Sequence, residues 1–296
     1  MLCEGGRVAD RLAFTARAQP LRVGEPEPFV HGYAWRHPRP AATLVLVHGL
    51  QSHAQWFAEA AEALVDRGLA VYAVDRRGSG SSPAVRGDVA SYGTWYGELG
   101  RVVRLAQEEH PGVPVHLVGH CFGANVALGY ALSSGAGTTV RSIVMLTPGL
   151  YVHPDYTPAQ KLRILASGRL APLTRFPVPQ RDDLFTRDPD VLAWIASDSG
   201  GARTLTARCL LQINHMVRRL RREVGQLRVP VLVLEAARDR LAHNARNRAL
   251  LGRALGDRCQ WQTFDAEHFL LAEPCRDQVV EALAEWVTQG KEHVRC

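Results

Sequence analysis

Short apolar runs alternate with longer amphipathic segments along much of this chain. The apolar runs have the length of buried strands: Thr43–Val47, Ala70–Val74, Val115–Val118 and Ser142–Leu146. The intervening segments carry apolar residues at helical spacing: Ala54–Asp66, Tyr92–His110 and Ala124–Leu132. Continuously apolar strands joined by helices predict an α/β fold, with a mostly parallel central sheet and helices on both faces.

This alternation stops in the second half of the chain and then resumes. Between about Gly149 and Gln226 there are many prolines, several helical patches and no convincing strand. Two further strands, each followed by a helix, come next: Val231–Glu235, Asn244–Leu255, Gln260–Phe264 and Arg276–Gln289. We therefore expect a core of residues 1–148 and 227–296, interrupted by a helical cap insertion over 149–226. Two short antiparallel strands, Leu12–Arg17 and Val30–Arg36, are predicted ahead of the core.

Composition narrows the class of protein. With 296 residues, 46% of them hydrophobic, the chain can bury one large core. Its apolar runs are far shorter than a membrane span, and its N-terminus lacks the apolar stretch of a signal peptide. The six cysteines are scattered without C-x-x-C spacing, so neither a metal site nor a disulfide framework is indicated. We expect a cytoplasmic protein without metal or cofactor, from a GC-rich bacterial gene given its arginine, alanine and glycine bias.

The most informative motif is the pentapeptide Gly119-His120-Cys121-Phe122-Gly123, which has the form G-x-nucleophile-x-G. A predicted strand precedes it and a predicted helix follows it. A strand that turns sharply into a helix needs small residues on both sides of the bend, and it pushes the residue at the tip outward. Cys121 would then lie over a helix N-terminus, where an anion is favoured and free N–H groups point at a reacting carbonyl.

Several other stretches join this motif in a family resemblance. They are Val47–Leu50 with His53, Asp75–Ser82, Arg86–Val89 with Tyr92 and Tyr96, Leu184–Pro189, Arg238-Asp239 and Glu267–Leu271. Together with the pentapeptide they make the chain resemble the α/β-hydrolases, and within them the monoacylglycerol-lipase and lysophospholipase branch. The resemblance extends from about residue 10 to residue 290. The chain departs from that branch at Cys121, where the branch carries serine.

The catalytic partners in such a fold follow in the chain order nucleophile, acid, histidine. Cys121, Asp239 and His268 satisfy this order, and each lies just beyond a predicted strand. Cys121 would attack an acyl carbon, His268 would shuttle the proton, and Asp239 would orient the imidazole. Asp265 and Asp75 are the rival acids, and a buried inert thiol is the alternative interpretation of Cys121.

The remaining candidate site residues surround this trio. The resemblance implies an oxyanion hole made by the backbone N–H groups of Leu50 and Phe122. It also implies that four further residues line the substrate pocket or support it: His48, His53, His120 and Phe269. Apolar residues of the insertion are candidates either to cover an acyl pocket or to form the cap's own core: Leu162, Ile164, Leu165, Leu170, Leu173, Phe176 and Trp194.

The insertion is also basic. It holds 12 basic and 7 acidic residues, hence +5 of the chain's formal +6, and a cluster lies just before the returning strand: Arg218, Arg219, Arg221 and Arg222. Three interpretations remain open: a solvated surface, a docking site for an acidic acyl carrier protein or anionic substrate, and attachment to an anionic membrane surface. No nucleic-acid-binding module accompanies the charge.

These features predict a hydrolase that cleaves an ester, lactone or thioester of a small-molecule acyl substrate through a thioester acyl-enzyme. A thioester also reacts readily with thiols and amines. The first alternative is therefore an acyltransferase or cyclase of specialised metabolism, which passes the acyl group to an amine, thiol or hydroxyl. A non-catalytic binding protein on a hydrolase scaffold is the second alternative.

Overall fold

The computed structural model describes residues 12–24, 29–133 and 139–289. Eight strands form one twisted sheet in the order β1-β2-β4-β3-β5-β6-β9-β10. The strands are β1 (Gln19–Val23), β2 (Val30–Trp35), β3 (Thr43–Val47), β4 (Ala70–Asp75), β5 (Val115–His120), β6 (Ser142–Leu146), β9 (Val231–Ala236) and β10 (Cys259–Phe264). Strand β2 pairs antiparallel with both β1 and β4, and all other neighbours are parallel.

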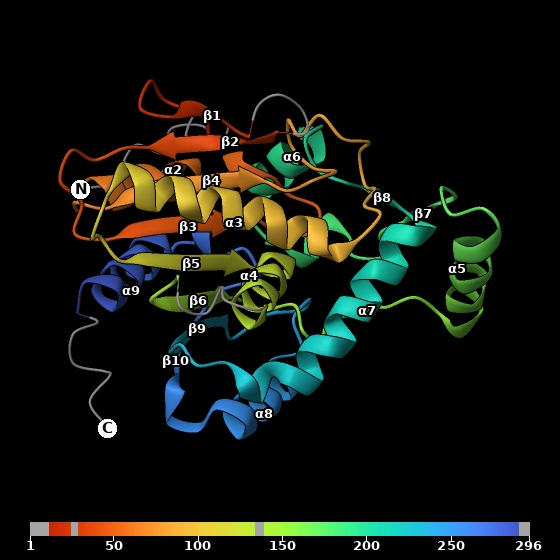
Figure 1. Cartoon of the computed structure of the whole chain (residues 1–296). Coiled ribbons are helices and arrows are strands. Elements are labelled where there is room, and N and C mark those ends of the chain that lie inside the picture. Colours follow the sequence, from red (N-terminus) through yellow and green to blue (C-terminus); the bar gives the residue numbers. More distant parts are fainter. Residues whose placement is uncertain (1–11, 25–28, 134–138, 290–296) are drawn as a thin grey trace.

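Helices cover both faces of this sheet, as the apolar strands predict (Figure 1). The core helices are α2 (Ala58–Val65), α3 (Tyr92–Glu109), α4 (Phe122–Leu132), α8 (Asn244–Leu255) and α9 (Arg276–Gln289), and short 3₁₀ turns lie at Ala54–Phe57, Val224–Gln226, Gly256–Arg258 and Leu270–Ala272. Successive strand residues point to opposite faces. In β3, for example, Val45 joins the hydrophobic core under α3 and α4, and Leu46 joins the core under α2 and α9.

The first strand lies further along the chain than we expected. Residues 12–17 form turns and irregular backbone, and the strand that pairs with β2 is Gln19–Val23. Leu12 is nonetheless buried, and Phe14 stacks on Tyr33 with the ring centroids 3.8 Å apart. The apolar residues that suggested a strand therefore pack against the sheet. The hydrogen-bonded pairing with β2 begins at Val23, next to Gly24, and extends back to Gln19.

The stretch between β6 and β9 adds no strand to the main sheet, and all of residues 147–230 are described. It contains α5 (Pro158–Leu170), β7 (Arg175–Pro177), a 3₁₀ turn at Asp182–Leu184, α6 (Pro189–Ser197), β8 (Thr204–Thr206) and α7 (Ala207–Glu223). Strands β7 and β8 pair antiparallel, so our expectation of no strand here was wrong. Helix α5 lies furthest from the sheet (Figure 1). The domain boundaries at 148 and 226 stay a prediction.

The apolar residues of α5 and the following turn only partly follow our expectation. Ile164 is buried with Phe176 and Ala207 in a small separate cluster. Four leucines are exposed instead: Leu162, Leu165, Leu170 and Leu173. They neither cover a pocket nor build a core, because α5 packs one face on α7 and turns the other outward. None of the described helices is both long and apolar enough to cross a membrane.

Candidate active site

Cys121 lies at a strained turn between β5 and α4. Its backbone has φ 51° and ψ −113°, a region that non-glycine residues rarely occupy. The turn is held on both sides, since the Cys121 N–H donates to the Leu146 carbonyl at 2.9 Å and the Cys121 carbonyl accepts from the Gly149 N–H at 3.1 Å. Strain of this kind persists where the surroundings fix it, and it is typical of functional sites.

The two glycines of the pentapeptide allow this turn. A Cβ on Gly119 would overlap the backbone of Ala124, in the first turn of α4. A Cβ on Gly123 would overlap the carbonyl group of Val47, at the end of β3. Strand, bend and helix therefore approach one another too closely for any side chain at these two positions.

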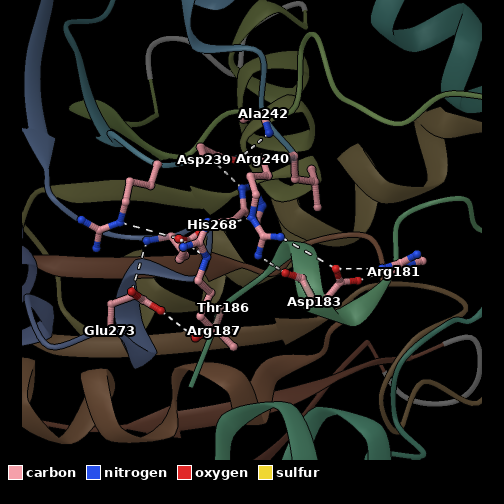
Figure 2. Close-up of polar contacts among 12 residues, drawn as sticks. Arg181, Asp183, Thr186, Arg187, Asp239, Arg240, Ala242, His268 and Glu273 are labelled. Carbon is pink, nitrogen blue, oxygen red and sulfur yellow. Dashed lines mark hydrogen bonds and ion pairs between the residues drawn. The ribbon is translucent and has the colours of Figure 1, made fainter. Parts of the chain in front are cut away.

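Asp239 and His268 come together beyond the ends of β9 and β10 (Figure 2). The His268 Nδ1 and Asp239 Oδ2 atoms are 2.8 Å apart, and both side chains are fully buried. The other carboxylate oxygen, Oδ1, accepts the backbone N–H groups of Leu241 at 2.8 Å and Ala242 at 2.7 Å. Both oxygens of Asp239 are thus engaged, so the carboxylate is fixed in the orientation that holds the imidazole.

The second ring nitrogen of His268, Nε2, is not used by Asp239. His268 Nε2 is buried and has no hydrogen-bond partner in the described part of the chain. Burial alone lowers the pKa of His268, but the charge and hydrogen bond of Asp239, together with the adjacent Cys121, raise that pKa to about 10.

Neither rival acid holds His268. Asp265 is exposed and forms an ion pair with Arg238. Asp75 accepts the backbone N–H groups of Ala54 and Ser81, each at 2.9 Å, and lies 2.8 Å from His31 Nδ1. Asp75 therefore ties the turn after β4 to Ala54 and to the ring of His31.

The two backbone donors predicted for an oxyanion hole belong to the elbow and to the loop after β3. Phe122 is the first residue of α4, and Leu50 lies in the loop after β3. Neither N–H has an acceptor among the residues that the structure describes. Gly49 lies against the elbow, because a Cβ placed on it would be 3.5 Å from Cys121 Cβ. The assignment of these two N–H groups to an oxyanion hole stays a prediction.

The four predicted pocket residues divide into two pairs. His120 and Phe269 lie near His268. The centroid of the His120 ring is 5.1 Å from that of the His268 ring and 5.7 Å from that of the Phe269 ring. Burial lowers the pKa of His120 to about 3, so this ring is neutral. His48 and His53 each have a polar partner within the protein. His48 Nε2 accepts the Arg76 backbone N–H at 3.1 Å, and His53 Nε2 lies 2.9 Å from Asp198 Oδ1.

Sequence reasoning missed how the insertion is attached to the histidine loop. The Phe185 ring packs edge-on against His268, with the centroids 5.6 Å apart, and its carbonyl accepts the Phe269 N–H at 2.8 Å. The Thr186 hydroxyl donates to the buried Glu273 carboxylate at 2.7 Å, as Figure 2 shows. The segment Leu184–Pro189 entered the family resemblance without a role, and nothing in its sequence indicated these partners.

The buried Glu267 adds a second connection between the insertion and the site. Its carboxylate lies 3.0 Å from Arg187 Nε and 3.2 Å from Arg240 Nε. Arg187 belongs to the insertion, and Arg240 directly follows Asp239.

Among the described residues, no group of histidine, cysteine and acidic side chains is arranged to hold a metal ion.

The chain is similar to known hydrolases over most of its length. Residues 38–275 match the Hydrolase_4 family, described as serine aminopeptidase, S33. A monoacylglycerol lipase of Mycolicibacterium smegmatis is 26% identical over 84% of this chain and 88% of its own length. Two solved structures share the fold. The monoacylglycerol lipase of Paleococcus ferrophilus has a TM-score of 0.79 and 22% identity over 88% of this chain and 99% of its own. A soluble variant of the Saccharomyces cerevisiae monoglyceride lipase has a TM-score of 0.82 and 15% identity over 93% and 96%.

These similarities extend over the elements that carry the candidate site. They confirm the α/β-hydrolase fold predicted from the apolar strands, and they place the chain on the branch that its motifs resembled. The family description names a serine enzyme, and this chain carries Cys121 at the elbow. The chain belongs to the Hydrolase_4 family and is a hydrolase of the monoacylglycerol-lipase-like branch of the α/β-hydrolases.

Proposed function

We propose that this ester-cleaving α/β-hydrolase of the monoglyceride lipase type works through a thioester formed on Cys121, with His268 as general acid and base and Asp239 as the orienting acid. The observation that carries the proposal is the arrangement of His268. One ring nitrogen is 2.8 Å from a fixed carboxylate, and the other is buried, unpartnered and beside the thiol of the strained elbow.

In the acylation step, the Cys121 sulfur attacks the acyl carbon and forms a C–S bond. The carbonyl oxygen gains negative charge, and in this proposal the N–H groups of Leu50 and Phe122 donate to it. Collapse of this intermediate breaks the C–O bond of the ester. The leaving alkoxide takes the proton that His268 Nε2 received from the thiol, so an alcohol departs and neutral imidazole remains.

In the deacylation step, His268 takes a proton from water as the water oxygen attacks the thioester carbon. The C–S bond then breaks, the carboxylic acid leaves, and the proton returns from His268 to the sulfur. Throughout both steps Asp239 stays ionised, holds the tautomer of the ring and stabilises the imidazolium.

The relatives indicate the substrate class. Those described above are lipases of monoacylglycerols, so we propose a small-molecule acyl ester as the substrate. Phe185 packs against His268, and Trp56 contacts three aromatic rings of the core and the insertion: Phe185, Trp194 and Phe269. Apolar surroundings of this kind suit an acyl chain better than a charged substrate.

Transfer of the acyl group to an amine, thiol or hydroxyl is the second candidate function. The observation in its favour is burial, because Cys121 is only 6% exposed and His268 is fully covered. A site that closes over its thioester excludes bulk water, which lets a bound acceptor compete with hydrolysis.

A product analysis separates these candidates. The purified protein would be given an aryl ester and a short acyl thioester, each with and without an amine or a thiol acceptor. Hydrolysis predicts free acid under all conditions, and transfer predicts acyl amide or a new thioester whenever the acceptor is present. A non-catalytic binding protein would release neither product above the background rate, and that result would overturn the proposal.

The basic cluster offers less to a carrier protein than its sequence suggests. Arg219 pairs with Glu223 at 2.7 Å, and Arg221 donates to the Leu150 carbonyl and lies 3.8 Å over the Tyr151 ring. Arg218 and Arg222 remain exposed. If they recruit an acidic acyl carrier, kcat/KM for a carrier-bound substrate should fall steeply with salt, and that for a neutral ester should not.

The compartment is also a proposal. The four cysteines that the structure describes, Cys121, Cys209, Cys259 and Cys275, are free thiols. Free thiols are typical of a reducing compartment, so we propose a cytoplasmic location. Redox state of the cysteines in protein isolated under alkylating conditions would test this.

A further inference from the structure

A buried arginine next to the candidate site has an unusual set of partners. Arg76 directly follows β4 and is 3% exposed. Its side chain donates to consecutive carbonyl groups of the loop after β3: Nε to His48 at 3.2 Å, and Nη2 to Gly49 through a short contact and to Leu50 at 3.5 Å. One side chain therefore holds three successive peptide units of the loop that carries a predicted oxyanion donor.

The partners of Arg76 differ from those of its neighbour. Arg77 pairs with the Glu98 carboxylate at 2.6 Å. For Arg76, no carboxylate lies within ion-pair distance in the described ranges, and burial lowers its pKa to about 10. A buried cation without a carboxylate is costly unless other groups satisfy it. Here the loop carbonyls do so, and the guanidinium also lies 4.9 Å over the ring of Phe122.

Peptide geometry connects these contacts to the oxyanion hole. The C=O of one residue and the N–H of the next point in opposite directions across a trans peptide, and the 49–50 peptide is trans. Because Arg76 holds the Gly49 carbonyl on its own side, the Leu50 N–H points away from the guanidinium. This N–H has no acceptor among the described residues, and Gly49 lies against Cys121.

We propose that Arg76 is a positioning residue for the oxyanion hole. It holds the Leu50 N–H through the loop carbonyls, and it holds Phe122, which supplies the other N–H, through its ring. Arg76 contacts no reacting atom in this role and acts only through the two backbone donors. The inference rests on the proposed chemistry at Cys121, and the two can fail separately.

Two reactions of the same thiol test the proposal. Acylation by p-nitrophenyl acetate passes through an oxyanion, whereas alkylation by iodoacetamide does not. Arg76→Lys keeps the positive charge but cannot span three carbonyls with a planar fork. We expect its acylation rate constant, measured from the p-nitrophenol burst, to fall about 100-fold, as for a displaced catalytic group. Its alkylation rate constant should stay within about threefold of the wild type.

The matched control is Arg77→Lys, which changes the neighbouring arginine but leaves the loop contacts in place. It should retain both rates. Equal losses of acylation and alkylation in Arg76→Lys would overturn the inference, because they would show an effect on the thiol itself. Unchanged acylation would overturn it as well. Absence of any acylation in the wild-type protein would instead reject the proposed function.

A second variant covers failure of Arg76→Lys to fold, which circular dichroism and urea unfolding would reveal. Phe122→Leu removes the ring beneath the guanidinium and keeps the backbone N–H. We expect it to lose about tenfold in acylation, less than the 100-fold of a fully displaced donor, with alkylation again unchanged. If Phe122→Leu acylates at the wild-type rate, the contact between guanidinium and ring does not position the donor.

Discussion

At the scale of single residues, the proposed chemistry depends on one sulfur atom. Cys121 is the described cysteine whose proximity raises the pKa of the His268 imidazole. Two other cysteines are simply buried, and burial raises the pKa of the Cys209 thiol and of the Cys259 thiol to about 12. A thiol that stays protonated does not react with an alkylating agent. The environments of these described cysteines therefore predict that Cys121 is modified before Cys209 and Cys259.

We expect iodoacetamide to label Cys121 before the other five cysteines and to abolish ester cleavage in proportion to labelling. Peptide mapping by mass spectrometry with parallel activity measurements would check this. Cys121→Ala should remove turnover, and Cys121→Ser should retain a small fraction, because His268 must then deprotonate a far weaker acid. Labelling spread evenly over all cysteines, with activity intact, would contradict the assignment.

The charge state of His268 leads to a second prediction. Asp239 helps to hold the pKa of His268 near 10, so the imidazolium that protonates a leaving alkoxide persists into alkaline solution. In Asp239→Asn that support is lost and burial lowers the pKa, so the imidazolium disappears at a lower pH. We expect kcat to fall on the order of 10²–10⁴-fold.

The measurement is the pH profile of kcat/KM for an alkyl ester, whose leaving group needs a proton. The alkaline limit of Asp239→Asn should move to lower pH than in the wild type. Asp265→Asn, which alters an exposed acid paired with Arg238, is the control and should leave the profile unchanged. An alkaline limit that stays in place in Asp239→Asn would show that another group holds the proton.

Residue-scale prediction from the sequence had a clear limit. Chain order and strand ends led to Cys121, Asp239 and His268, and the structure brings the acid and the histidine within 2.8 Å. The family resemblance implied that His48 and His53 line the pocket or support it. Their partners, Arg76 and Asp198, lie 28 and 145 residues away in the chain, and local sequence carries no information about such contacts.

At the scale of elements, the elbow depends on the close approach of β3, β5 and α4. Gly123 allows α4 to start against the Val47 carbonyl, where no Cβ fits. Gly97 lies in the middle of α3, and nothing is within 4 Å of the position its Cβ would take. The two glycines therefore respond in opposite ways to the same substitution.

We expect Gly123→Ala to lower the free energy of unfolding by about 1–3 kcal/mol, since the overlap forces strand and helix apart. Gly97→Ala should raise it by roughly 0.5–1 kcal/mol, because alanine is the better helix former. Urea unfolding of both variants, followed by circular dichroism, measures this. A Gly123→Ala protein as stable as the wild type would show that the elbow can relax without cost.

The insertion shows why some elements were predicted and others were not. Continuous apolar runs identify buried parallel strands, because both faces of such strands are covered. Strands β7 and β8 have only three residues each, too few for any periodic pattern, and they exist because they pair with each other. Helix α5 has Pro158 in its first turn and a capping box from Thr157, so its start is locally encoded, whereas its exposed leucines do not follow from its sequence.

At the scale of the whole molecule, burial of histidines couples folding to pH. Burial lowers the pKa of His116 to about 4 and of His120 to about 3, and it lowers that of His48 well below its usual value. Unfolded histidine titrates near pH 6.5. Below that pH the unfolded chain binds protons at these positions and the folded chain does not, so stability falls as the pH falls.

Between pH 6.5 and pH 5 each of these histidines should cost the folded state about 1.4 kcal/mol per pH unit, if its folded pKa lies below that window. His268 adds no slope there, because its raised pKa keeps it protonated in the folded state and the unfolded chain also protonates it. The free energy of unfolding from urea titrations at pH 7, 6 and 5 should therefore decline steeply.

Two variants test whether the buried rings cause this decline. His116→Gln changes a ring at the start of β5, at the opposite end of that strand from the elbow, and it should lose one histidine's share of the decline. His215→Gln, at an exposed position on α7, should leave the decline intact. A wild-type stability that stays constant from pH 7 to pH 5 would mean that the buried rings gain protons without unfolding, and the packing around His48, His116 and His120 would then be looser than their burial indicates.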